Sequence, residues 1–139
     1  MEAFSEEWAR TWCQALNGDP AFRSAAHGWA GDVTLVMTQS SAPEAPQRSV
    51  RVDIRHGECF TSNPDAGSDI AESSYVLAAT GAAWNELLSG RQNPLTALMT
   101  GKLRLTRGSL VALLPYAAMA RELIRLAIGM NATIPEGWG

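Results

Sequence analysis

Residues 86–105 read ELLSGRQNPLTALMTGKLRL, and the helix-ending and helix-starting residues in this stretch decide the fold. Gly90 predicts the end of one helix. Asn93 and Pro94 predict the start of the next, because asparagine caps helix N-termini and proline suits the first helical position. Gly101 predicts the end of that short helix. The stretch is therefore expected to form a corner of two helices followed by a strand.

The Gly101-Lys102 pair also invites comparison with a phosphate-binding loop, which has the pattern G-x-x-x-x-G-K-[ST] between a strand and a helix. Here Leu103 occupies the hydroxyl position, no glycine stands at the required upstream spacing, and the order is helix then strand. A phosphate loop is therefore excluded. We interpret residues 102–106 as a strand in which Leu103 and Leu105 face inward and Lys102 faces water.

The same alternation of apolar and polar residues predicts four further strands, at residues 32–38, 48–55, 58–61 and 75–80. Their outward positions carry charges or hydroxyls, which is typical of a sheet with one wet face and one face covered by helices. The predicted fold class is therefore α+β: two layers, with a five-stranded, mostly antiparallel sheet and helices covering one face. No linker or repeat divides the chain, so a single domain over residues 1–139 is expected.

Helical periodicity is clearest at the two ends of the chain. Residues 3–17 are predicted to form a helix with one apolar stripe, made of Phe4, Trp8, Trp12 and Leu16. The C-terminal helix is expected to begin at Ser109, and residues 110–128 are more apolar than a single contact with a sheet requires. That helix needs a second apolar surface, which a partner subunit, another helix or a bound lipid could supply. Pro115 is expected to kink or divide it.

Composition excludes several classes of function. The chain has 46% hydrophobic and 18% charged residues and a net charge of −3, and its eleven basic residues look scattered, so no nucleic-acid partner is expected. No run of 18 residues is free of charge, so no transmembrane segment is expected. The N-terminus does not resemble a signal peptide. Cys13 and Cys59 are therefore interpreted as reduced thiols of a cytoplasmic protein.

Residues that could carry chemistry are few. His27 and His56 belong to no cluster with metal-ligand spacing, so no metal site is expected. Cys59 lies three residues from His56, and a thiolate–imidazole pair is one conceivable catalytic arrangement. The acidic residues show no paired or buried pattern, and no cofactor motif is present. We therefore expect no catalytic residues and no cofactor, and the imbalance between polar and apolar residues favours binding over catalysis.

The apolar residues expected between sheet and helices are the candidate lining of a binding pocket. A filled core is the simpler explanation of these residue types, and a cavity for a hydrophobic ligand is the alternative. The candidates are Leu35, Met37, Val52, Ile54, Leu77, Trp84, Leu87, Leu98, Met99, Leu103, Leu105, Leu113, Leu114 and Met119.

The corner at residues 87–105 resembles the sterol carrier protein type 2 (SCP-2) family, whose pattern is close to L-x-x-G-x-x-N-P-x-x-A-x-x-x-G-K-L-x-[VIL]. The segments ALNGDPAFR (15–23) and GWAGDVTLVM (28–37) are similar to small, single-domain bacterial members. The resemblance implies a five-stranded sheet with helices on one face and a tunnel between the layers that receives fatty acyl chains, acyl-CoA or sterols. It also implies a C-terminal helix at the tunnel mouth and no catalytic activity.

Three hypotheses follow from the sequence. The first is non-enzymatic binding or transfer of a hydrophobic ligand, such as a fatty acid, an acyl-CoA or a sterol-like lipid, in the implied tunnel. The alternative is a protein–protein interaction or dimerisation module with a filled core. Its apolar C-terminal helix would contact a partner protein or a second copy in a homodimer. The third is an enzyme that uses Cys59 and His56 or an unrecognised carboxylate in a loop.

Overall fold

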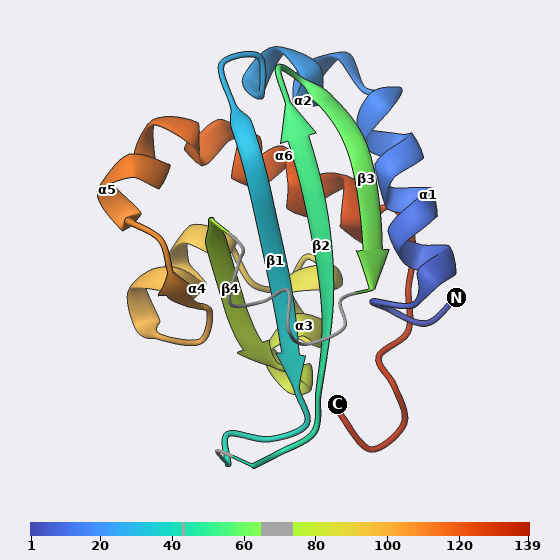
Figure 1. The fold of residues 1–139 in the computed structure, drawn as a ribbon. Helices are drawn as coiled ribbons and strands as arrows, with labels where there is room; N and C mark the ends of the chain where they lie inside the picture. Colours follow the sequence, from blue (N-terminus) through green and yellow to red (C-terminus); the bar gives the residue numbers. More distant parts are fainter. Residues whose placement is uncertain (43, 65–73) are drawn as a thin grey trace.

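The computed structural model describes residues 1–42, 44–64 and 74–139 of the chain (Figure 1). The elements follow in the order α1 (Glu6–Asn17), α2 (Pro20–Ala25), β1 (Ala30–Thr38), β2 (Gln47–Arg55), β3 (Glu58–Pro64), β4 (Tyr75–Thr80), α3 (Gly81–Leu88), α4 (Pro94–Thr100), β5 (Arg104–Arg107), α5 (Leu110–Leu113), the 3-10 turn η2 (Leu114–Tyr116) and α6 (Ala117–Ile128).

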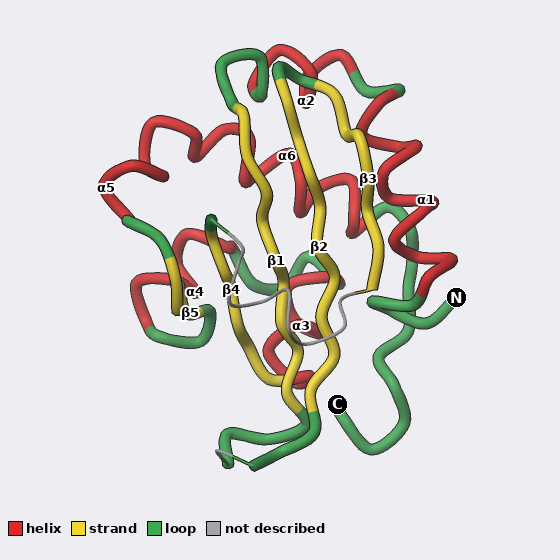
Figure 2. The backbone as a smooth tube through the Cα atoms, in the orientation of Figure 1, coloured by secondary structure: helices red, strands yellow, loops and turns green. Residues whose placement is uncertain are grey.

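The strands form one sheet in the order β3-β2-β1-β4-β5. β1 and β4 run parallel, and every other neighbouring pair is antiparallel. Figure 2 shows α3 and α6 behind the sheet and α1 beside β3, while α4 and α5 lie at the β5 edge. The predicted α+β fold with a mostly antiparallel sheet is confirmed.

Capping side chains set the helix starts. Asn93 Oδ1 accepts hydrogen bonds from the backbone N–H of Leu95 and Thr96, at 2.9 and 3.2 Å, and so fixes the start of α4. Gly101 ends α4 with φ +83°, a conformation that favours glycine. The predicted helix start at residue 3 is wrong, because Ser5 is the N-cap of α1. The expected division of the C-terminal helix at Pro115 is confirmed, since the proline lies in η2 between α5 and α6.

The core lies between the sheet and the helices that cover it. Trp8, Trp12 and Trp84 are fully buried there. Two of these indoles also join separate parts of the fold: Trp12 Nε1 donates to the backbone oxygen of Leu123 at 3.1 Å, and Trp84 Nε1 donates to that of Val36 at 2.8 Å. The buried indoles therefore hold α1 to α6 and α3 to β1 by hydrogen bonds as well as by packing.

The outward face of the central strands is more buried than the alternation of apolar and polar residues predicts. Thr34 on β1 is fully buried, and Val36, Val76 and Ala78 form a second, small buried cluster. Asp32 is also buried on β1, where Arg51 on β2 binds its carboxylate at 2.6 Å. A wet face is therefore wrong for β1 and β4, whereas the outward side of β2 keeps half-buried Arg51 and Asp53 and exposed Arg55.

The two cysteines are joined, so the prediction of reduced thiols is wrong. A disulfide links Cys13 on α1 to Cys59 on β3, with 5.5 Å between the Cα atoms. Asn17 lies against the same junction, where its amide nitrogen donates to the Cys59 carbonyl at 2.9 Å and its amide oxygen accepts from the Cys59 N–H at 2.8 Å. Because disulfides are typical of oxidising compartments, the two cysteines no longer support a cytoplasmic location.

No helix in the described ranges combines the length and the apolar character needed to cross a bilayer.

Replacing Asp32 with asparagine is expected to lower the free energy of unfolding at neutral pH by about 1–2 kcal/mol, because the variant loses hydrogen bonds to a charged acceptor. Burial raises the pKa of Asp32, but hydrogen bonds from Ser74 and the Arg51 guanidinium outweigh it and hold the pKa below its usual range. A group whose pKa is lowered on folding stabilises the fold above its unfolded pKa, near 4 for aspartate, and loses that contribution as the pH falls through the folded value.

The measurement is urea unfolding of both proteins across that acidic range. The difference between Asp32→Asn and the parent protein should shrink as the pH falls below about 4. Asp53→Asn on neighbouring β2 is the control, because its carboxylate is paired with Arg55 at the surface. A difference that does not change with pH would contradict a charge-based role for Asp32.

Candidate functional site

An apolar groove opens between α4 and the run of α5, η2 and α6. The empty space within it is about 630 Å³, part of which is continuous with solvent. The groove is lined by Asn93, Pro94, Leu95, Leu98, Leu110, Leu113, Leu114, Ala117, Ala120 and Arg121. Most of these side chains are exposed or half-buried, so the groove is an open surface feature and not a sealed cavity.

Helical spacing places these side chains on facing walls. On α4, Leu95 and Leu98 are three residues apart and therefore lie on one face. The opposite wall repeats this spacing on both sides of Pro115. Before the proline it carries Leu110 and Leu113 on α5 and Leu114 on η2. After the proline it carries Ala117, Ala120 and Arg121 on α6.

The break at Pro115 gives the opposite wall two segments. The first carries leucines, of which Leu113 is buried at the base of the groove. The second carries Ala117 and Ala120, whose short side chains leave space that larger residues would fill. The other face of α6, which carries Met119 and Leu123, packs in the core. The surplus of apolar residues in 110–128 is therefore divided among the core, the groove and exposed positions such as Val111.

Arg121 gives the groove its charge. The ten described residues that line the groove include this one cation and no acidic residue. The neighbouring Glu122 is directed away, to Arg125 on the same helix, and Arg125 also binds Asp19 at 2.8 Å. An apolar surface with one arginine among its lining residues is complementary to an aliphatic chain with an anionic end.

The structure brings three of the predicted pocket residues into the groove: Leu98, Leu113 and Leu114. Most of the others are buried in the core between sheet and helices: Leu35, Met37, Val52, Ile54, Trp84, Leu87, Leu103 and Met119. Leu77 and Leu105 are partly buried against that core, whereas Met99 is 81% exposed on α4. No strand residue lines the groove, so it differs in place from a tunnel between the layers.

Seven lining residues were not among the predicted ones. Leu110, Ala117, Ala120 and Arg121 repeat at helical spacing around Pro115, and Leu95 lies three residues before Leu98. That spacing could have found all five. Asn93 and Pro94 were interpreted only as the start of α4, and their second role depends on how α4 faces α5.

The proposed pairing of Cys59 with His56 is wrong. The Cys59 sulfur is bonded to Cys13 and is not available as a nucleophile. His56 is exposed, with Nδ1 3.3 Å from the backbone oxygen of His27. This arrangement offers no catalytic thiolate.

Comparison with known proteins gives matches among solved structures. No family model matches the chain, and no curated protein does. A crystal structure of sterol carrier protein 2 has 37% sequence identity and a TM-score of 0.80, with 91% of this chain and 98% of that chain covered. The solution structure of a conserved hypothetical protein from Thermus thermophilus, described as possibly a sterol carrier protein, has 38% identity and a TM-score of 0.81, with 99% and 94% covered.

A more distant structure extends the similarity of fold. The solution structure of sterol carrier protein domain 2 of Helicoverpa armigera has 16% identity and a TM-score of 0.57, with 92% of this chain and 91% of that chain covered, and shows the shared fold alone. The two structures at 37% and 38% identity match nearly the whole chain. The chain therefore belongs to the sterol carrier protein type 2 (SCP-2) family.

Proposed function

We propose that this protein binds an aliphatic lipid in the groove between α4 and α5–η2–α6 and transfers it without chemical change. The observation that carries the proposal is the groove itself, an apolar surface whose one ionised side chain is Arg121. The names of its relatives, which include sterol carrier protein 2, support a lipid as the class of ligand.

The proposed ligand is a fatty acid or a similar chain with an anionic end. Leucine and alanine side chains supply the apolar walls, and each methylene removed from water contributes about 0.8 kcal/mol. Arg121 would donate hydrogen bonds to the carboxylate, since charge-assisted hydrogen bonds between arginine and carboxylate are stronger than neutral ones. A neutral sterol would fill the same walls without using this charge.

The proposed role is that of a carrier. The walls consist mainly of leucine, alanine and proline side chains, and the amide oxygen of Asn93 accepts a hydrogen bond from the backbone N–H of Leu95 in the α4 cap. These groups bind and orient a chain but do not move protons or form covalent bonds. Leu98, Leu113 and Leu114 are the predicted pocket residues that we propose as ligand contacts.

Replacing Arg121 with alanine is expected to weaken binding of palmitate about tenfold and to leave binding of the corresponding alcohol unchanged. The reason is that the variant loses a charge-assisted hydrogen bond, which contributes about 1.5 kcal/mol for an exposed arginine, while the apolar walls remain. The measurement is displacement of a fluorescent fatty acid by palmitate and, separately, by hexadecanol.

Arg91→Ala is the matched control, because Arg91 is an exposed arginine near α4 that does not line the groove. Its affinity for both competitors should equal that of the parent protein. Failure of the parent protein to bind the fluorescent fatty acid would reject the proposed function. Equal loss of palmitate and hexadecanol binding in Arg121→Ala would retain the groove but reject the role of the charge.

A further inference from the structure

An exposed apolar surface surrounds the mouth of the groove. Among the described residues, seven large hydrophobic side chains are exposed, and five of them lie on α4, α5 and η2: Leu95, Met99, Leu110, Val111 and Leu114. We call these five residues the apolar rim. Met99 and Val111 are 81% and 78% exposed and do not line the groove, so neither core packing nor the groove explains them.

The chain around the rim is strongly basic, although the basic residues look scattered in the sequence. Residues 87–121 contain five basic residues and no acidic residue, whereas the rest of the chain contains six basic and fourteen acidic residues. The five are Arg91, Lys102, Arg104, Arg107 and Arg121. All five are exposed, and Lys102 forms an ion pair with Glu86, in which Nζ and Oε2 are 3.6 Å apart.

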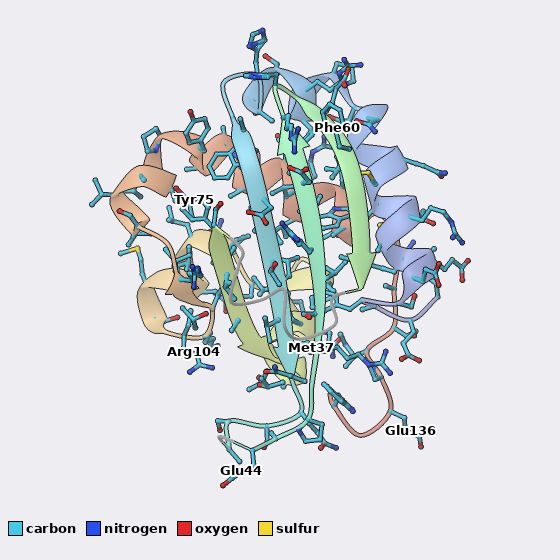
Figure 3. All side chains as sticks on the ribbon, in the orientation of Figure 1. Met37, Glu44, Phe60, Tyr75, Arg104 and Glu136 are labelled. Carbon is cyan, nitrogen blue, oxygen red and sulfur yellow. A yellow bond between two sulfur atoms is a disulfide. The ribbon has the colours of Figure 1, made fainter. Side chains whose placement is uncertain are left out.

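These residues gather at one edge of the molecule. Figure 1 shows α4 and α5 at the β4 side of the sheet, away from α1 and β3. Figure 3 places Arg104 beside α4 at this edge and Phe60 on the opposite side. The acidic first turn of α1, with Glu6 and Glu7, belongs to that opposite side. The charge is therefore divided across the molecule: basic around the rim and acidic elsewhere.

We propose that the apolar rim and the basic residues around it form a docking surface for a phospholipid bilayer that contains anionic lipids. Exposed aliphatic side chains flanked by arginines are typical of proteins that lie on such a surface, since the apolar groups enter the interface and the cations pair with phosphate headgroups. The aliphatic character of the rim favours lipid over nucleic acid, which is bound through aromatic stacking and phosphate contacts.

The groove and the docking surface share residues. Leu95, Leu110 and Leu114 belong to the rim and also line the groove. When the rim lies on a bilayer, the mouth of the groove faces the lipid, so a chain enters or leaves without crossing water. Water around an aliphatic chain opposes transfer by about 0.8 kcal/mol per methylene. The proposal goes beyond ligand binding, and it can fail while ligand binding stands.

The experiment is flotation of the full chain with vesicles of phosphatidylcholine, alone or mixed with phosphatidylglycerol, at low and high salt. The parent protein is expected to bind the mixed vesicles and to bind less as salt rises. Met99→Asp and Val111→Asp should each lower the vesicle partition coefficient about tenfold, since each removes apolar contact and adds a repelled charge. Arg91→Gln and Arg104→Gln should each lower it about fivefold.

Phe60→Asp is the matched control, because Phe60 is also exposed and apolar but lies on β3 at the opposite side. It should keep the parent's partition coefficient, and Met99→Asp should keep the parent's affinity for a fluorescent fatty acid in the absence of vesicles. Absence of vesicle binding by the parent protein, or an equal loss in Phe60→Asp, would overturn the proposal. So would a dimer in sedimentation velocity that Val111→Asp dissociates, because a second copy would then cover the rim.

Discussion

Replacing Ala117 with tryptophan is expected to lower the affinity for a fluorescent fatty acid about a hundredfold while the fold remains intact. Ala117 lines the groove on α6 and is itself exposed, so the indole can enter the groove without displacing core side chains. Excluding about four ligand methylenes from the walls costs about 3 kcal/mol, which corresponds to the expected loss. Fluorescence titration measures the affinity, and circular dichroism measures the thermal midpoint.

Ala118→Trp is the matched control. Ala118 is the next residue on α6 and is also exposed, but it does not line the groove. It should leave the affinity within about twofold of the parent value, since it adds the same side chain outside the groove. Full binding by Ala117→Trp would place the ligand elsewhere, for example between the sheet and the helices, where the resemblance implies a tunnel.

The fold was predictable because its signals are local. Asn93-Pro94, Gly101 and Pro115 act through their own backbone geometry, so the start and end of α4 and the break after α5 follow from residue type. The alternation in 48–55 is equally local, since successive side chains in a strand point to opposite faces. The buried outward face of β1 is not a local property, because it depends on the neighbouring strands.

The groove was only partly predictable, since it depends on how elements far apart in the sequence face each other. Leu98 and Met99 are adjacent apolar residues of similar size, so residue type alone does not indicate which of them lines a pocket. In the structure Leu98 lines the groove and Met99 is exposed, because α4 turns one face toward α5 and the other toward solvent. Helical period fixes which residues share a face, but tertiary packing decides what that face meets.

Cys13 and Cys59 show the same limit more sharply. One lies on a predicted helix and the other on a predicted strand, 46 residues apart. Spacing alone does not identify a pair of this kind, because a disulfide requires the two Cα atoms to lie within about 7 Å. That proximity arises only when α1 packs against β3.

Replacing both cysteines with alanine is expected to lower the free energy of unfolding by about 4 kcal/mol. The disulfide closes a loop with a sequence separation of 46, and the chain-entropy relation gives this value for a loop of that length. The thermal midpoint should fall by roughly 10–20 °C, since a change of 1 kcal/mol shifts a domain of this size by a few degrees. Differential scanning calorimetry under non-reducing conditions is the measurement.

Two comparisons separate the covalent bond from the packing around it. A reductant should lower the midpoint of the parent protein toward that of Cys13→Ala/Cys59→Ala and leave the double variant unchanged. Asn17→Ala, which removes two hydrogen bonds to Cys59 but keeps the disulfide, should lower the free energy of unfolding by about 1–3 kcal/mol.

Below its midpoint, the double variant should bind the fluorescent fatty acid as the parent does, because α1 and β3 lie away from α4 and α5 (Figure 1). A double variant that unfolds at the parent's midpoint would show that the packing of α1 on β3, and not the disulfide, holds this side of the fold together.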